Sequence, residues 1–221
     1  MCGRYVRKGE PKKVAEFLGV KDGEENWTPS FNVAPSATIP IVTTVPAGRH
    51  MVPAIWGFTS SGRAPLFNAR GETVDSLPSF KDSFRQSRCL VPASGFYEWR
   101  QSDRQPFYFE RCDGQPLAFA GIWKLVGNHL EATVITTTPN SDMRGIHHRM
   151  PVILDPGVWT DWLRREPLDD TERQRLHSPL PDNTLSRWPV GRGVGSVRND
   201  YPSLIDPIEE PPREITSDFF K

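Results

Sequence analysis

Proline constrains the fold of this chain more than any other residue type. The sequence has 22 prolines among 221 residues, spread along its whole length. Because proline interrupts helices and the interior of sheets, the elements between the prolines must be short. The sequence shows no internal repeat, low-complexity tract or long linker. We therefore expect one compact domain over residues 1–208, followed by a polar tail over residues 209–221.

Short runs rich in β-branched and aromatic residues predict strands between the turns. They are Gly3–Val6, Ile39–Thr44, Met51–Phe58, Cys89–Pro92, Phe96–Trp99, Phe107–Glu110, Leu117–Lys124 and Leu130–Thr137. Helices are predicted at Pro11–Leu18, Ser79–Phe84, Asp155–Arg164 and Asp169–Leu176. Strands outnumber helices and do not alternate regularly with them. This pattern favours an α+β fold with a central antiparallel, barrel-like β-sheet and short flanking helices.

Composition limits the classes of function. The 27 acidic and 27 basic side chains cancel, so any contact with nucleic acid must come from a local basic patch. No apolar run approaches the ~20 residues of a membrane span, and the start of the chain lacks a signal-peptide pattern. The three cysteines form neither a metal-ligand spacing nor an even-numbered disulfide framework. We expect a cytoplasmic protein with no metal and no membrane contact.

Cys2 offers the most unusual chemistry in the sequence. If an aminopeptidase removes Met1, Cys2 carries a thiol beside a free α-amine, and both have a reactive fraction near neutral pH. An aldehyde can form a Schiff base with the amine, and the thiol can then close a thiazolidine ring. The thiol could instead attack an acyl group, with the amine as its base. A buried structural cysteine is the third interpretation.

Two polar segments could serve such chemistry. Phe31–Pro35, which contains Asn32, is typical of a structured loop between turn signals. In Asn68–Thr73, Arg70 could hold a phosphate or a carboxylate, and Asn68 could both donate and accept hydrogen bonds. A simple turn and a solvated loop are the alternative interpretations.

Glu98 stands among aromatic residues in a predicted strand. Alternation places Phe96 and Glu98 on one face of that strand and Tyr97 and Trp99 on the other. In an apolar setting the pKa of this carboxyl group would rise, and the group could act as a general acid or base. A glutamate at a strand end that faces solvent is the alternative.

His147 and His148 are the adjacent histidines of the chain. One of them could act as an acid or base, with Arg149 as an anion anchor. Neighbouring side chains in an extended segment point in opposite directions, so both imidazoles could not easily reach one atom. No further ligand lies at a metal-binding spacing. A surface loop explains the segment equally well.

Basic and aromatic residues recur together, a pattern that favours a groove for single-stranded DNA but also fits a solvated face. They are Arg63, Arg70, Lys81, Arg85 and Arg88, with Trp56, Phe67, Phe80 and Phe84. A glycine-rich polar segment, Gly191–Asn199, matches neither the P-loop nor the Rossmann pattern.

Seven stretches in this order resemble the SOS response-associated peptidase (SRAP) family, over nearly the whole chain. They are Met1–Tyr5, Phe31–Pro35, Trp56–Gly57, Asn68–Arg70 with Glu72–Thr73, Gly95–Trp99, Ile146–His147 with Arg149–Pro151, and Val197–Asn199. The resemblance implies a sensor and shield of abasic sites in single-stranded DNA, active in the DNA damage response. It also implies a compact α+β domain with a barrel-like sheet.

The resemblance further implies a thiazolidine crosslink between Cys2 and the aldehyde of the ring-opened abasic deoxyribose. Asn68 would hold the opened sugar or the Cys2 backbone. Glu98 would shuttle protons during ring closure and help to reverse the crosslink. His147 would assist sugar ring opening and imine formation. No cofactor and no metal is implied.

The implied DNA-binding residues follow from the same stretches and the basic loops, with Arg4 and Arg70 holding phosphates around the lesion. They are Arg4, Asn32, Pro35, Trp56, Arg70, Lys81, Arg85 and Arg149. The expected partner is single-stranded DNA that contains abasic sites. We expect a monomer, because capture by one terminal residue needs no second subunit, and a cytoplasmic protein that joins the nucleoid when DNA is damaged.

Two departures from the family pattern and two rival functions stay open. Phe58–Pro65 is shorter than the family's segment at this place, and His148 replaces its usual acidic residue. One rival is a Cys2-dependent peptidase, either autoproteolytic or an acyl-transfer amidohydrolase. The other is a single-stranded DNA-binding module without a covalent step.

Overall fold

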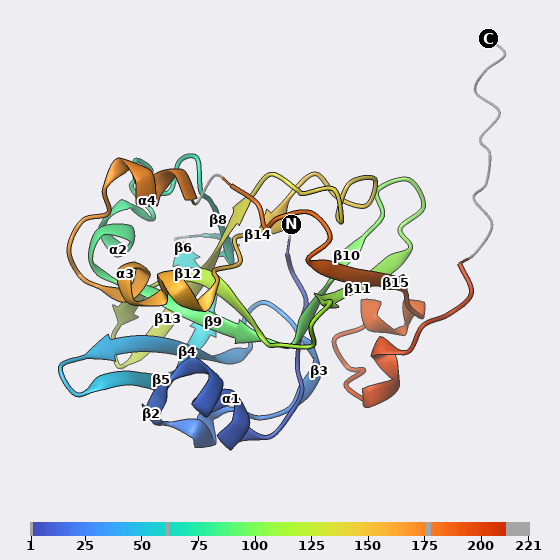
Figure 1. Cartoon of the computed structure of the whole chain (residues 1–221), viewed down its shortest axis with the longest axis horizontal. Helices are drawn as coiled ribbons and strands as arrows, with labels where there is room; N and C mark the ends of the chain where they lie inside the picture. Colours follow the sequence, from blue (N-terminus) through green and yellow to red (C-terminus); the bar gives the residue numbers. More distant parts are fainter. Residues whose placement is uncertain (1, 61, 176–177, 211–221) are drawn as a thin grey trace, which may run out of the picture.

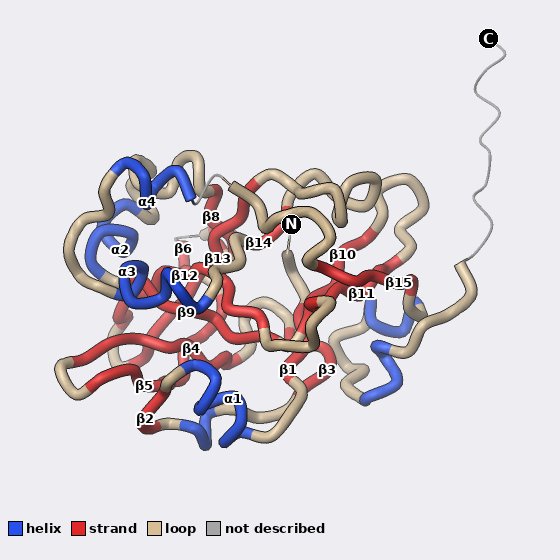
Figure 2. Tube along the Cα trace, in the orientation of Figure 1, coloured by secondary structure: helices blue, strands red, loops and turns tan. Residues whose placement is uncertain are grey.

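The computed structural model describes residues 2–60, 62–175 and 178–210, and strands dominate it (Figure 1, Figure 2). Two sheets lie side by side, and short helices cover the outer side of the larger one. The predicted α+β class with a barrel-like sheet is confirmed.

The larger sheet closes into a barrel. Its strands follow the order β14-β13-β12-β9-β4-β5-β2, and β13 also pairs with β5 in parallel, which closes the ring. The strands of the ring are β4 (Thr38–Val45), β5 (Gly48–Trp56), β9 (Arg88–Ala93), β12 (Leu117–Val126) and β13 (His129–Thr137). Three short strands extend its edges: β2 (Val20–Asp22), β8 (Asn68–Arg70) and β14 (Met150–Pro151).

The second sheet is antiparallel throughout. Its order is β15 (Leu185–Pro189), β11 (Pro106–Arg111), β10 (Gly95–Trp99), β1 (Tyr5–Arg7) and β3 (Ser30–Val33). One face of this sheet shares a core with the barrel. The ring of Tyr5 meets that of Trp56 edge to face at 5.3 Å, and Phe96 meets Phe119 at 6.0 Å. Such aromatic contacts add to the free energy of apolar burial and fix how the sheets sit together.

The helices are short and lie around the barrel. They are α1 (Pro11–Leu18), α2 (Lys81–Gln86), α3 (Trp159–Leu163) and α4 (Asp170–Arg175), with 3-10 turns at Glu24–Asn26, Pro156–Val158, Arg192–Gly195 and Pro202–Ile205. α1 ends at Gly19, whose φ of 63° lets its N–H reach the carbonyls of Ala15 and Glu16. None of the helices in the described ranges is long and apolar enough to cross a bilayer.

The predicted strands coincide with β1, β4, β5 and β9 to β13 within a few residues. The prediction for Met51–Phe58 was wrong at its end, because Gly57 adopts a φ of 125° and breaks the strand. Phe58 begins β6 (Phe58–Ser60), which pairs with β7 (Arg63–Leu66) as a small separate hairpin. The short segment after Gly57 is therefore a hairpin that follows the barrel strand β5.

Two segments interpreted as loops form strands. Ser30–Val33 is β3, paired with β1, and Asn68–Arg70 is β8, paired in parallel with β13. Each is a short edge strand whose pairing partner is distant in sequence, so its local polarity gave no sign of it. β2, β6, β7, β14 and β15 were also not predicted as strands.

The predicted helix over Asp155–Arg164 divides into a 3-10 turn at Pro156–Val158 and α3. The predicted helix over Asp169–Leu176 is α4, and Leu176 lies outside the described residues. In the predicted tail, residues 211–221 also lie outside the described residues. The boundary at residue 208 stays a prediction.

Candidate active site

Cys2 lies in the core between the two sheets. Its side chain is fully buried, in the same apolar cluster as Tyr5, Trp56 and Phe96. Burial, and after it the negative charge of Glu98, raises the pKa of the Cys2 thiol. The thiol is therefore protonated at neutral pH, and a base must take its proton before the sulfur can attack.

Asn68 holds the backbone of Cys2. β8 lies against β13, with Asn68 opposite Val134, and this pairing aims the amide of Asn68 at the start of the chain. Its Nδ2 donates a hydrogen bond of 2.9 Å to the carbonyl oxygen of Cys2. Its Oδ1 is buried and has no hydrogen-bond partner within the described part of the chain. A buried amide oxygen without a partner is costly, so this atom is available to a bound polar group.

Glu98 occupies the face of β10 that alternation predicted. Phe96 packs in the core shared with the barrel, whereas Tyr97 and Trp99 pack on the opposite face. Glu98 is 2% exposed, and its burial raises the pKa of the carboxyl group to about 7. A carboxyl group with this pKa can both take and give a proton at neutral pH.

His147 lies in the loop between β13 and β14. Its Nε2 is 3.9 Å from Oε2 of Glu98, and its Nδ1 is 3.1 Å from the backbone N–H of Arg149. Burial first, and then nearby positive charge that includes Arg104, lowers the pKa of His147 to about 4. The imidazole is therefore neutral at pH 7. Nδ1 is also 3.1 Å from the carbonyl oxygen of Arg149, so this nitrogen contacts both backbone polar groups of that residue.

The fold thus brings together Cys2, Asn68, Glu98 and His147 from separate parts of the sequence. In Figure 1 the segment that leads into β1 runs between β8 and β14 on one side and β10 on the other. Within the described ranges, no group of three or more His, Cys, Asp or Glu side chains could hold a metal ion. The site therefore offers a thiol, a carboxyl group that titrates near neutrality and a neutral imidazole.

The side chain of Arg149 forms an ion pair and hydrogen bonds within the protein. Its guanidinium forms a two-pronged ion pair with Glu72, with N–O distances of 2.5 and 2.8 Å. It also donates a hydrogen bond of 2.5 Å to the carbonyl oxygen of Thr136, and the side chain is buried. Arg149 thus fastens the loop of His147 to β13 and to the segment after β8.

Arg4 and Asn32 bind each other and the glycine-rich segment. Arg4 Nη1 donates to Asn32 Oδ1 at 2.6 Å and to the carbonyl oxygen of Val194 at 2.7 Å. Asn32 Nδ2 donates to the carbonyl oxygens of Ser196 and Asn199 at 2.9 and 2.7 Å. The segment Gly191–Asn199, which matched no nucleotide-binding pattern, is held against β1 and β3 by this pair.

Trp56 is fully buried. Its ring packs against Tyr5 and Phe67, and its Nε1 donates a hydrogen bond of 2.9 Å to the carbonyl oxygen of Phe67. In this structure Trp56 has no exposed face on which a base could stack. It lies in the core between the two sheets.

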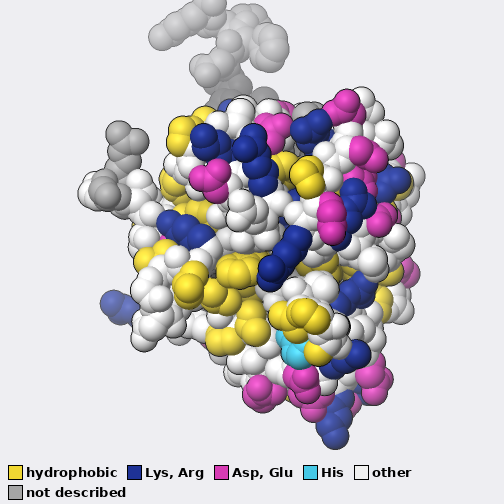
Figure 3. All heavy atoms as spheres, turned by 90° about the vertical axis from the view of Figure 1, so that its left-hand side faces the viewer, with side chains coloured by type: hydrophobic (Ala, Val, Ile, Leu, Met, Phe, Trp, Pro, Cys, Tyr) yellow, Lys and Arg dark blue, Asp and Glu magenta, His cyan; other side chains and the backbone are white. Residues whose placement is uncertain are grey.

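The remaining candidates are accessible but do not form one group. Arg70 is exposed at the end of β8, two residues after Asn68, and Pro35 is half-buried. Lys81 and Arg85 lie on α2, which in Figure 1 is separated from β10 by the barrel strands. Figure 3 views that outer side, where a band of apolar side chains is flanked by Lys and Arg intermixed with Asp and Glu. That side is not a continuous basic groove.

Arg88, which the sequence grouped with these residues, is buried. It donates hydrogen bonds to the carbonyl oxygens of Phe84, Arg85, Trp162, Arg164 and Glu166. These hydrogen bonds join the end of α2 to the segment after α3. Because carbonyl oxygens occupy its N–H donors, Arg88 has few donors left for a phosphate.

Sequence reasoning missed Arg104, in the turn between β10 and β11. Arg104 is exposed and has a φ of 60°, which is uncommon for a residue other than glycine. Within the described part of the chain, the side chain of Arg104 has no hydrogen-bond or ion-pair partner. The positive charge of Arg104 contributes to lowering the pKa of His147. The signal in the sequence was its place in the first turn after the strand of Glu98.

The fold and the site define a single α+β barrel domain built around a cysteine at its amino end. The family described as SOS response associated peptidase (SRAP) matches residues 1–197, and this chain belongs to that family. It is 32% identical to the abasic site processing protein YoqW of Bacillus subtilis, over 93% of this chain and 99% of that protein.

Other relatives span similar lengths. The abasic site processing protein YedK of Escherichia coli is 30% identical over 94% of this chain and 100% of its own length. The Gallus gallus protein HMCES is 29% identical over 94% of this chain and 73% of its own length. A solved structure from Bacteroides thetaiotaomicron has the same fold, with a TM-score of 0.81 and 22% identity over 94% of this chain and all of that one.

Proposed function

We propose that this protein captures abasic sites in single-stranded DNA through Cys2 after removal of Met1. The observation that carries the proposal is the convergence of Asn68, Glu98 and His147 on the buried Cys2. Relatives named abasic site processing proteins support the choice of an abasic site as substrate. The aldehyde of the ring-opened deoxyribose is the group with which an N-terminal amine and thiol react together.

The chemistry requires two bonds at one carbon. The α-amine of Cys2 attacks C1′ of the opened sugar, and loss of water gives an imine. The sulfur then adds to the same carbon, and the thiol proton moves to the imine nitrogen, which closes the thiazolidine. Met1 must be removed first, because a nitrogen in an amide bond cannot form an imine.

The surroundings of each group support an assignment of the proton transfers. The raised pKa of the Cys2 thiol calls for a base, and Glu98, whose charge acts on this thiol, can serve as that base in its ionised form. In its protonated form Glu98 can return the proton when the ring reopens. The neutral imidazole of His147 can take the proton of the sugar's C1′ hydroxyl as the sugar ring opens, which frees the aldehyde.

Phosphates on either side of the lesion need cations at the mouth of the site. We assign this role to Arg70 and Arg104, which are exposed next to Asn68 and His147 respectively. Pro35 would border the strand, and Lys81 and Arg85 would meet it farther away. Arg4, Asn32, Trp56 and Arg149 would act by holding the walls of the site, because their polar groups or rings are engaged within the protein.

The test is the intact mass of the purified protein before and after incubation with a single-stranded oligonucleotide that bears one abasic site. We expect the mass of Met1 to be absent and an adduct to form that equals protein plus DNA less one water. Cys2→Ala should form no adduct. Cys112→Ala is the matched control, because Cys112 is an exposed free thiol, and it should react as the unmodified chain does.

Each rival function gives a different result in this experiment. A non-covalent DNA-binding module would bind the oligonucleotide without a stable adduct. A Cys2-dependent peptidase or amidohydrolase would lose Met1 and leave the DNA unmodified. An adduct that survives Cys2→Ala would refute the thiazolidine.

A further inference from the structure

His148 has no part in the proposed chemistry, although it stands beside His147. The two rings stack with their centroids 4.4 Å apart and an angle of 26° between their planes. The expectation that neighbouring side chains point in opposite directions was wrong here, because residues 141–148 form turns and a bend rather than a strand. The second imidazole therefore covers one face of the first.

Gln101, in the turn between β10 and β11, anchors His148. Its Nε2 is 2.8 Å from Nδ1 of His148, and its backbone N–H donates a hydrogen bond of 3.2 Å to the carbonyl oxygen of Ile146. Gln101 thus binds the loop of His147 and His148 through both its backbone and its side chain.

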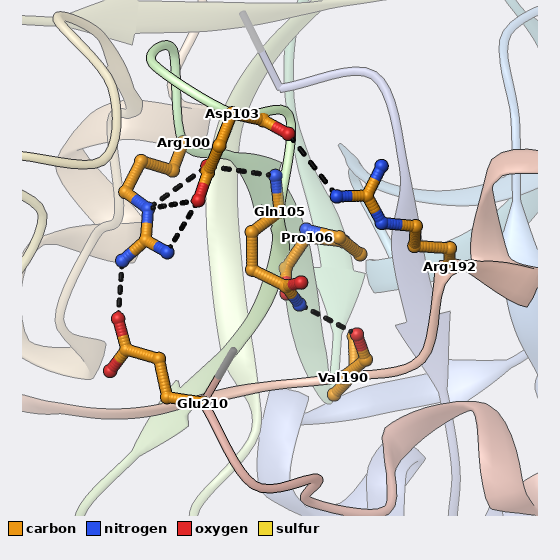
Figure 4. A network of polar contacts seen from close by, with 7 residues as sticks. All are labelled: Arg100, Asp103, Gln105, Pro106, Val190, Arg192 and Glu210. Atoms are coloured by element: carbon orange, nitrogen blue, oxygen red, sulfur yellow. Dashed lines mark hydrogen bonds and ion pairs between the residues drawn. The ribbon is translucent and has the colours of Figure 1, made fainter. Parts of the chain in front are cut away.

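The turn that carries Gln101 is itself braced, as Figure 4 shows. Arg100 is buried, binds both carboxylate oxygens of Asp103 and pairs with Glu210. Asp103 accepts the backbone N–H of Gln105, and the side chain of Gln105 donates to the carbonyl oxygen of Val190 at 2.8 Å. Gln101 is therefore presented from a support fastened to two later segments of the chain.

We propose that His148 is a positioning residue of this site. Held by Gln101 and stacked on His147, its ring fixes the plane of the His147 imidazole, with Nδ1 against the backbone of Arg149 and Nε2 toward Glu98. The inference rests on the proposed function for its effect on the reaction rate. Its structural part concerns the free protein.

The stack restrains rotation of this ring in addition to the contacts of its two nitrogens. Rotation about the bond that joins the imidazole to its Cβ would move Nδ1 away from Arg149 and Nε2 away from Glu98. Terminal torsions of this kind are broad, so packing on a face must restrict them. A stacked aromatic ring does this at small cost, and a residue without a ring does not.

The rate of crosslinking and the affinity for DNA together distinguish a positioning role from a DNA-binding role for His148 and Gln101. In His148→Ala we expect the rate of crosslinking to abasic DNA to fall about tenfold, because a misplaced acid–base group lowers the rate without weakening binding. His148→Phe keeps the stack and should restore most of the rate. Gln101→Ala should lie between them. Affinity for an undamaged single-stranded oligonucleotide should stay the same in all three.

His129→Ala is the matched control for loss of an imidazole. His129 begins β13, at the end far from the loop of His147, about 26 Å away along the strand. We expect it to crosslink at the wild-type rate. A rate in His148→Ala equal to that of the control would overturn the proposal.

A spectroscopic measurement on the free protein tests the same inference without DNA. Long-range ¹H–¹⁵N correlation spectra distinguish the two nitrogens of a neutral histidine. We expect His147 to be a single tautomer in the wild type and in His148→Phe, and to average between tautomers in His148→Ala. Identical His147 signals in all three would refute the positioning role. A wild type that forms no crosslink would instead refute the proposed function, and the spectra would still judge this inference.

Discussion

The imidazole of His147 and the carboxyl group of Glu98 face each other at 3.9 Å across the candidate site, with opposite changes in pKa. Burial raises the pKa of Glu98 to about 7 and lowers that of His147 to about 4. Both changes favour the uncharged form, so the pair at neutral pH is close to a neutral acid beside a neutral base rather than an ion pair. Such a pair can pass protons in either direction as charge develops on a substrate.

Glu98→Gln tests the base. The carboxylate fraction of Glu98 rises as the pH passes through about 7, so the wild-type crosslinking rate should rise over that range. The amide cannot take the thiol proton, and the variant should be slower by about 10²-fold, with a flatter pH dependence. Crosslinking rates from pH 5.5 to 8.5 on gels decide the matter. Equal rates and equal reversal in both proteins would remove Glu98 from the mechanism.

The same substitution should alter stability with a defined sign. A carboxyl group whose pKa is raised by folding stabilises the fold at low pH, and this contribution is lost as the pH rises through the folded-state value. The loss occurs between about pH 4.5 and 7, and it amounts to about 3 kcal/mol at most. At pH 8, Glu98→Gln should therefore unfold at higher urea concentration than wild type. At pH 4 the difference should vanish.

Asn68→Ala removes the hydrogen bond to the carbonyl oxygen of Cys2. The reactive amine then loses its fixed position, and the crosslinking rate should fall by about 10-fold to 10²-fold. Asn68→Asp is the sharper variant, because it keeps the shape but places an acceptor against the carbonyl oxygen of Cys2. We expect it to be slower than Asn68→Ala. A fully active Asn68→Asp would show that this hydrogen bond has no part in the reaction.

The sequence singled out the residues of the candidate site more clearly than it predicted the strands that carry them. Cys2, Glu98 and His147 were recognisable by their chemistry and order, and alternation placed Glu98 on the correct face of its strand. The strand of Asn68 was not predictable from local pattern, because β8 exists only through its pairing with β13. A short polar segment carries no periodicity that reports a partner more than 60 residues away.

The arginines show why charge and type alone do not assign contacts. Arg4, Arg70, Arg88 and Arg149 are alike in sequence, but the structure engages three of them internally and leaves Arg70 exposed. The carbonyl oxygens and carboxylates that occupy them come from distant segments. Burial of a cation becomes favourable only when such acceptors are assembled by the fold.

Arg70→Ala and Arg104→Ala should each weaken non-covalent binding of single-stranded DNA. Each removes one phosphate contact, so the dependence of log affinity on log salt should become shallower by about 0.7 per substitution. Arg165→Ala is the control, because Arg165 is an exposed arginine just after α3, away from the site. Fluorescence anisotropy with an undamaged oligonucleotide, at salt concentrations from about 50 to about 300 mM, gives the slope of log affinity against log salt for each protein. Slopes equal to that of the control would show that neither arginine contacts the DNA backbone.

Arg149→Ala should lower the stability of the protein more than it lowers the affinity for DNA. The substitution removes two hydrogen bonds to Glu72 and one to the carbonyl oxygen of Thr136, and hydrogen bonds to charged groups contribute about 1.5–3 kcal/mol each before exposure is considered. Because Glu72 is partly exposed, we expect a total loss of about 2–3 kcal/mol in the free energy of unfolding. Arg149→Lys keeps the charge but not the fork, and it should recover less than half of that loss. Urea denaturation of the two variants beside Arg165→Ala measures this directly. If Arg149→Ala matched the stability of the control and lost only DNA affinity, then Arg149 would have to leave Glu72 to bind a phosphate, and its ion pair in the free protein would be a resting state.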